Sequence, residues 1–92
     1  MSSDLDKEES PLKFPCEFPI KIMGREAADF DTHVRAIVDR NVGPPDLLEF
    51  RRRESRNDRF VSVTVTIRAT SRVQLDTLYR ELSGDPRILF VL

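Results

Sequence analysis

Five arginines in the middle of the chain are the residues best placed to do chemistry. They are Arg51, Arg52, Arg53, Arg56 and Arg59. Guanidinium groups bind carboxylates and phosphates, so this basic patch could bind nucleic acid or an acidic partner. The simpler interpretation is a solvated hairpin that its own carboxylates partly neutralise, since residues 46–72 hold seven arginines and four acidic residues. Residues 1–10, with a net charge of −3, could also pair with it.

Side chains that often carry catalysis or bind metals are sparse in this chain. Cys16 and His33 are the only cysteine and the only histidine, and no residues have the spacing of metal ligands. Glu26, Asp29 and Asp31 could act as a paired acid and base, but the dipole at the start of a helix already explains acidic residues there. We therefore expect no catalytic residue, no metal, no cofactor and no enzyme activity.

Gly24 stands alone between an expected strand and an expected helix. No glycine-rich phosphate loop surrounds it. Either the glycine permits a backbone angle that other residues avoid, or it lets a ligand approach the amides at the helix start. The residues leave both interpretations open.

The hydrophobic pattern predicts the elements that must position these side chains. Residues 59–69 alternate between apolar and polar without a break, which indicates a strand with one buried face. Further strands are expected up to Gly24, over 47–54 with Leu48 and Phe50 on one face, and over 87–92. A period near 3.6 predicts helices over 27–41 and from Ser71 to Gly84. Ser71 and Gln74 have the spacing of a capping box.

This order of elements predicts an α+β, ferredoxin-like βαββαβ sandwich. Its four antiparallel strands would follow the order 4-1-3-2, with two helices on one face. We expect residues 14–92 to form this domain and residues 1–13 to be a disordered acidic arm. The outer face of the third strand would carry Ser62, Thr64 and Thr66 without an aromatic side chain, which argues against base stacking and nucleic-acid binding.

The last strand is expected at an edge of the sheet with apolar side chains on both faces. Leu89 and Val91 would then face outward beside Met23. Such a face could be a few scattered exposed side chains or be covered by the N-terminal arm. The other interpretation is an interface with a second copy or with an unknown protein partner.

The overall composition suits a small globular protein and gives no sign of a membrane segment. Of the 92 residues, 39% are hydrophobic and 34% charged, and the net charge is −1. No apolar run approaches the roughly 18 residues that a membrane span needs. The acidic first ten residues do not resemble a secretory signal. With its single cysteine, the chain is expected to be cytoplasmic.

Several short segments resemble the YbeD-like family of small uncharacterised bacterial proteins. They are Lys21–Gly24, Ser62–Ile67 with Ala69 and Thr70, Leu78–Leu82 and the ending Val91-Leu92. The resemblance implies a ferredoxin-like fold similar to regulatory ACT domains, which bind ligands near the end of the first strand and the start of the first helix. By that similarity, Gly24, Arg25 and Glu26 would bind a small metabolite.

The resemblance also implies a non-enzymatic regulatory or protein-interaction module that senses a metabolite. This chain departs from the family pattern in its hairpin, where Arg51, Arg52, Arg53 and Phe60 replace residues of other types. Binding of nucleic acid or an acidic partner by the Arg-rich hairpin is therefore the alternative function.

Overall fold

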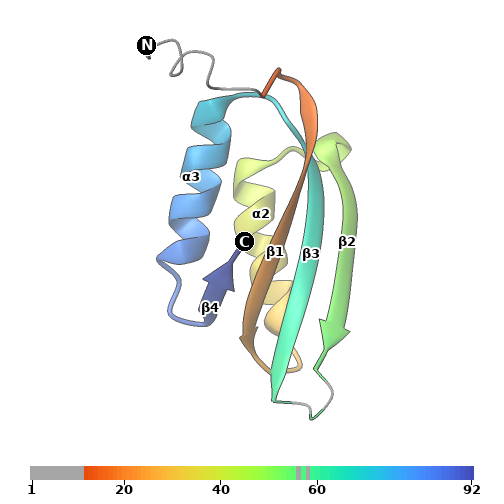
Figure 1. Cartoon of the computed structure of the whole chain (residues 1–92), viewed down its shortest axis with the longest axis vertical. Helices are drawn as coiled ribbons and strands as arrows, with labels where there is room; N and C mark the ends of the chain where they lie inside the picture. The colour runs from red at the N-terminus through yellow and green to blue at the C-terminus, as the bar shows by residue number, and fades with distance from the viewer. Residues whose placement is uncertain (1–11, 56, 58) are drawn as a thin grey trace, which may run out of the picture.

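The alternating segment becomes a central strand of a four-stranded antiparallel sheet. The computed structural model describes residues 12–55, 57 and 59–92. Its elements are β1 Cys16–Arg25, α2 Phe30–Asn41, the short 3-10 helix η1 Pro44–Asp46, β2 Leu47–Glu54, β3 Phe60–Ala69, α3 Arg72–Ser83 and β4 Ile88–Val91. The strand order is β2-β3-β1-β4, with β2 and β4 at the edges (Figure 1). The predicted ferredoxin-like fold and its strand order are confirmed.

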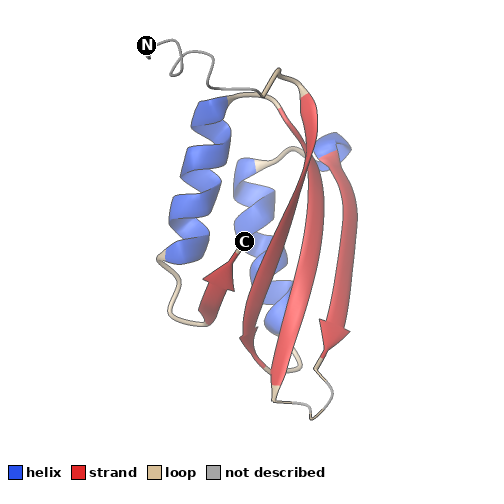
Figure 2. Ribbon diagram, viewed as in Figure 1, coloured by secondary structure: helices blue, strands red, loops and turns tan. Residues whose placement is uncertain are grey.

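One hydrophobic core lies between the sheet and the two helices (Figure 2). Every second residue of β3, from Val61 to Ala69, is at most 1% exposed. The helices contribute four buried residues from α2 (Phe30, Val34, Ile37, Val38) and three from α3 (Leu75, Leu78, Leu82). Because strand side chains alternate, the opposite row of β3 must face away from the helices.

The start of α3 forms one of the two hydrogen bonds of the predicted capping box. Ser71 Oγ accepts a hydrogen bond from the Gln74 amide at 3.1 Å. Gln74 Oε1 accepts from the amide of Thr70 at 2.7 Å instead of from that of Ser71. Gln74 also donates to the carbonyl of Asn41 at 3.0 Å, so the cap ties α3 to the end of α2.

Helix α2 begins at Phe30, three residues later than the sequence pattern predicts. The preceding residues form a connection that is bonded to the β2–β3 hairpin. Glu26 donates its amide to the carbonyl of Arg59 at 2.9 Å, and the Ala27 carbonyl accepts from Arg52 Nη2 at 3.2 Å. These partners are distant in sequence, so local periodicity could not reveal them.

The expected orientation of β4 was wrong for Val91. Ile22 pairs with Val91 and Met23 with Phe90, but Gly24 pairs with Ile88, because the register shifts at this point. The bulge leaves Leu89 44% exposed, and Val91 packs against the core. Phe90, not Val91, is therefore the outward neighbour of Met23.

Gly24 is required for space and not for an unusual backbone angle. No described glycine has a positive φ, so the conformational interpretation of Gly24 was wrong. A Cβ atom at this position would collide with the ring of Phe30 and would lie 2.6 Å from the carbonyl oxygen of Arg87. The glycine lets the first turn of α2 and the start of β4 pack directly on β1.

The predicted acidic arm lies mostly outside the described residues. Leu12 and Phe14, at the start of the described chain, are half-buried against the core. None of the helices in the described ranges is both long enough and apolar enough to cross a membrane.

We expect Gly24→Ala to destabilise the fold by about 2–3 kcal/mol, because the added methyl group overpacks a site closed by backbone and a buried ring. The matched control is Gly43→Ala, whose Cβ would meet only Pro45 Cδ at 3.8 Å and whose φ of −64° suits alanine. Urea unfolding measures both free energies. Equal stability of the two variants would contradict this account of Gly24.

Candidate binding face of the sheet

The outer face of the sheet has no helix over it in the part of the chain that the structure describes. Three cations from two strands gather there, which we call the cationic group: Lys21 of β1, and Arg51 and Arg53 of β2. Strand pairing places Thr64 of β3 between Lys21 and Arg51, and Ser62 beside Arg53. Edge and central strands thus bring together side chains that are distant in sequence.

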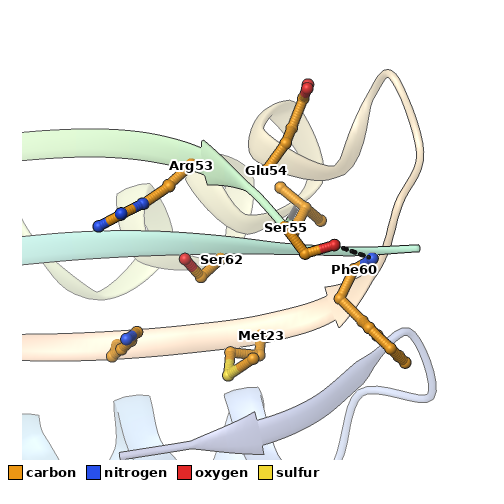
Figure 3. A pocket seen from close by; sticks show the side chains of 8 residues that line it. Met23, Arg53, Glu54, Ser55, Phe60 and Ser62 are labelled. Carbon is orange, nitrogen blue, oxygen red and sulfur yellow. Dashed lines mark hydrogen bonds between the residues drawn. The ribbon is translucent and has the colours of Figure 1, made fainter. Parts of the chain in front are cut away.

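Two neighbouring hollows open on this face. One, of about 240 Å³, is lined by the cationic group with Ser62 and Thr64, and Arg52 borders it. The other, of about 190 Å³, shares Lys21, Arg53 and Ser62 with the first and adds Met23, Phe60 and, at its rim, Glu54, which is bonded to Arg52. Figure 3 shows Met23, Phe60 and Ser62 around this second hollow, with Ser55 Oγ accepting a hydrogen bond from the Phe60 amide at 3.1 Å.

Apolar side chains flank the cationic group toward β4. We call Met23, Phe60 and Phe90 the apolar group. Met23 pairs directly with Phe90 on one side and with Ser62 on the other, and Phe60 lies one diagonal step away on β3. Phe90 is 61% exposed. The sequence pattern placed Leu89 and Val91 on the outer face, so Phe90 was expected to face the helices. The bulge reverses this, and Phe90 faces outward beside Met23.

The predicted patch of five arginines does not form one surface. Arg51 and Arg53 face outward, whereas Arg52 lies on the helix side of β2, opposite Val63. Arg59 is exposed in the turn before β3, and Arg56 lies outside the described residues. The period of two therefore divides three consecutive arginines between opposite faces of the sheet.

Arg52 is held by carboxylates from three segments. Its guanidinium donates to Glu26 and to Asp31 at 2.9 Å each, and to Glu54 at 3.3 Å. Burial alone would lower the pKa of Arg52, but the nearby carboxylates outweigh it and raise the pKa above its usual value. Arg52 thus connects the edge strand β2 to the start of α2.

The cationic group has little acid close to it. Arg51 contacts Glu49 at 3.1 Å, but both side chains are about half exposed or more, so the pair contributes little. Within the described ranges, Lys21 and Arg53 form no ion pair. The acids Glu26 and Asp31 are bound by Arg52 on the other side of β2, and so the outer face keeps an excess of positive charge.

The predicted metabolite site at Gly24, Arg25 and Glu26 is only partly open. The space beside Gly24 is filled by Phe30, and Glu26 is bound by Arg52. Arg25 and Glu26 border a hollow of about 250 Å³ together with Ala27, Pro86, Arg87 and Leu89. Metabolite binding here stays a prediction.

Of the two arginines that line this hollow, Arg87 is already paired. Arg87 donates to Asp29 at 2.7 Å, and this hydrogen bond lowers the pKa of the Asp29 carboxyl. The three acidic residues at the start of α2 thus have partners from other elements: Arg52 binds Glu26 and Asp31, and Arg87 binds Asp29.

The two reactive side chains of the sequence lie apart. Cys16 opens β1, where it pairs with Ala69 of β3. His33 lies in the first turn of α2, beyond the other end of β1, and its Nε2 contacts Asp85 Oδ2 at 2.7 Å. This placement gives no nucleophile and base in contact.

Comparisons with known proteins match nearly the whole chain to one family. Residues 9–92 match the family described as "Protein of unknown function (DUF493)". A UPF0250 protein of Chromobacterium violaceum is 44% identical over 89 residues, which are 95% of this chain and 98% of the relative. A UPF0250 protein of a Janthinobacterium species is 45% identical, with 98% and 99% covered.

A solved structure supports the fold independently. The C-terminal domain of the MgtC protein from Mycobacterium tuberculosis superposes with a TM-score of 0.67 over 88% of each chain. Its sequence identity to this chain is 20%, so the likeness concerns the fold alone.

We expect Arg52→Ala to cost about 1–3 kcal/mol of stability, since it removes hydrogen bonds to charged groups and leaves carboxylates without a partner. Arg51→Ala, the matched control one residue away, should cost less than about 0.5 kcal/mol because the ion pair of Arg51 with Glu49 is exposed. Urea is a suitable denaturant because it does not screen charge. A loss of stability as large for Arg51→Ala would contradict the assigned role of Arg52.

Proposed function

The chain belongs to the DUF493 (UPF0250) family of proteins of unknown function. From the uncovered face of the sheet we propose that it is a non-enzymatic interaction module. It binds an acidic protein partner through the uncovered face of its sheet. The observation that carries the proposal is the division of charge across β2. Arg52 binds Glu26, Asp31 and Glu54, and among the described residues the cationic group, which faces outward, has one ion pair, between Arg51 and Glu49.

The size of the hollows favours a protein segment over an enclosed metabolite. Pockets that enclose a small molecule have volumes of roughly 300–1,000 Å³ and bury most of the ligand. The hollows on the outer face measure about 190 and 240 Å³ and are open. Side chains of a partner can enter such shallow hollows while the partner's surface covers the rest of the sheet face.

The arrangement of the cations also favours a protein over nucleic acid. Lys21, Arg51 and Arg53 gather around one hollow, whereas a nucleic-acid backbone is followed by an extended basic stripe. The positions between them, Ser62 and Thr64, offer hydroxyl groups. Carboxylates accept hydrogen bonds from both kinds of group.

The non-enzymatic and cytoplasmic parts of the proposal rest on separate observations. Cys16 is the first residue of β1, and His33 lies in α2, which follows the other end of that strand; this separation supports a module without a catalytic pair. Cys16 is a free thiol, and free thiols are typical of proteins in reducing compartments. Both statements remain part of the proposal.

We expect purified protein to bind a fluorescently labelled poly-glutamate peptide at low ionic strength. Affinity should fall toward 0.15 M salt, where the Debye length is about 8 Å. The double variant Arg51→Ser with Arg53→Ser should bind about tenfold more weakly, since each exposed charge pair contributes roughly 0.2–1 kcal/mol. Fluorescence anisotropy measures both effects.

The matched control removes two arginines from the helix layer, Arg72→Ser with Arg80→Ser on α3. It changes the net charge equally and should keep the affinity. Equal losses in both double variants would show non-specific attraction, and no binding at low salt would overturn the proposal. Tighter binding of a single-stranded RNA of equal charge would replace the protein partner by nucleic acid.

A further inference from the structure

The apolar group adds a second chemistry to the same face. Water-exposed Phe90 and half-buried Met23 and Phe60 lie on adjacent strands of the sheet. An apolar cluster beside charged residues is typical of a binding surface, because water contact with it is unfavourable until a partner covers it. The face can therefore contact an apolar side chain of a partner as well as its carboxylates.

The two chemistries meet at shared residues. Lys21, Arg53 and Ser62 line both hollows. A side chain that enters the hollow beside Met23 and Phe60 therefore lies next to the cations that would bind a carboxylate. In Figure 3, Arg53 and Ser62 stand on one side of Met23, and the Phe60 ring on the other.

We infer that the partner segment carries an aromatic or large aliphatic side chain next to an acidic residue. The apolar side chain enters the hollow beside Met23 and Phe60, and the carboxylate binds Arg53 and Lys21. This inference rests on the proposed function and names its ligand class. A carboxylate alone would leave the apolar group in water, and an apolar side chain alone would leave the cations without an acid.

The face is less suited to a second copy of the chain. A symmetric contact through this face would bring two cationic groups into one interface. Glu49 is the acid that the structure places in contact with the cationic group, at 3.1 Å from Arg51. Like charges that are brought together without compensating acid oppose association. An acidic partner would neutralise the cationic group, whereas a second copy would add more positive charge.

Two labelled peptides with the same net charge test the inference. Both alternate glutamate and glycine, and one has a central phenylalanine where the other has alanine. We expect the phenylalanine peptide to bind the full chain about tenfold more tightly, the gain expected from partly burying one large side chain. Phe60→Ser and Phe90→Ser should each reduce this preference.

The control is Val73→Ser, which removes an apolar side chain of 73% exposure from α3. It should leave the preference unchanged. Phe90→Ser is the safer of the two test variants because Phe90 is 61% exposed, and thermal unfolding checks that each variant folds. The inference is overturned if both peptides bind equally to the native chain, or if Val73→Ser lowers the preference as much as Phe90→Ser does.

The two proposals fail in different ways. If both peptides bind with equal affinity and with salt dependence, the acidic-partner function stands and only the apolar requirement falls. If neither peptide binds at low salt, the proposed function falls and takes this inference with it. If the chain self-associates through this face, Phe90→Ser will shift its sedimentation toward monomer, which would assign the apolar group to a second copy.

Discussion

The structure depends on the strict two-sidedness of β3. Both neighbours of this strand are strands, so one row of its side chains must enter the core and the other must leave it. The inner row is almost completely buried, and each of its residues contributes roughly 1.5–3 kcal/mol of burial when the side chain is large. A shift of one residue would move this whole row into water. The position of the outer row, and with it the candidate binding face, follows from that cost.

The same alternation explains why consecutive arginines have different roles. On β2, a residue on the helix side approaches α2, and a residue on the outer side approaches Thr64 or Ser62 of β3. Arg52 meets Glu26 and Asp31, which also protects β2, because an inward charge on an edge strand discourages pairing with other chains. Because Glu26 and Asp31 bind Arg52 on the inner side, they do not neutralise Arg51 and Arg53 on the outer side.

The sequence predicts the strands and α3 well because these depend on local patterns, and the strand order then follows from the rules that govern connections. It fails where a residue's environment is set by partners that are distant in the chain. The late start of α2 depends on bonds to Arg52 and Arg59, and the need for glycine at position 24 comes from Phe30 and Arg87. A bulge reverses the face of Val91. A register shift near the start of β2 also makes the expectation for Leu48 wrong, because Leu48 is 45% exposed whereas Phe50 packs against the core. For the site, the sequence indicated the arginines. The period of two within β2 separates Arg52 from its neighbours, but the approach of Lys21 to Arg51 across Thr64 requires strand register.

Fold likeness contributes little to the function of this chain, so its function has to be argued from the residues on the uncovered face. A ferredoxin-like sandwich leaves one face of its sheet without helices whatever the sequence, and the MgtC domain shares that arrangement at 20% identity. What differs between such proteins is the chemistry of the exposed row. Here the uncovered face joins hydroxyl groups, cations and apolar side chains around two adjoining hollows. Stability alone requires none of these groups to gather there, because outward-facing strand positions accept many polar residues. Their convergence from three strands is the reason why we propose a binding role for this face.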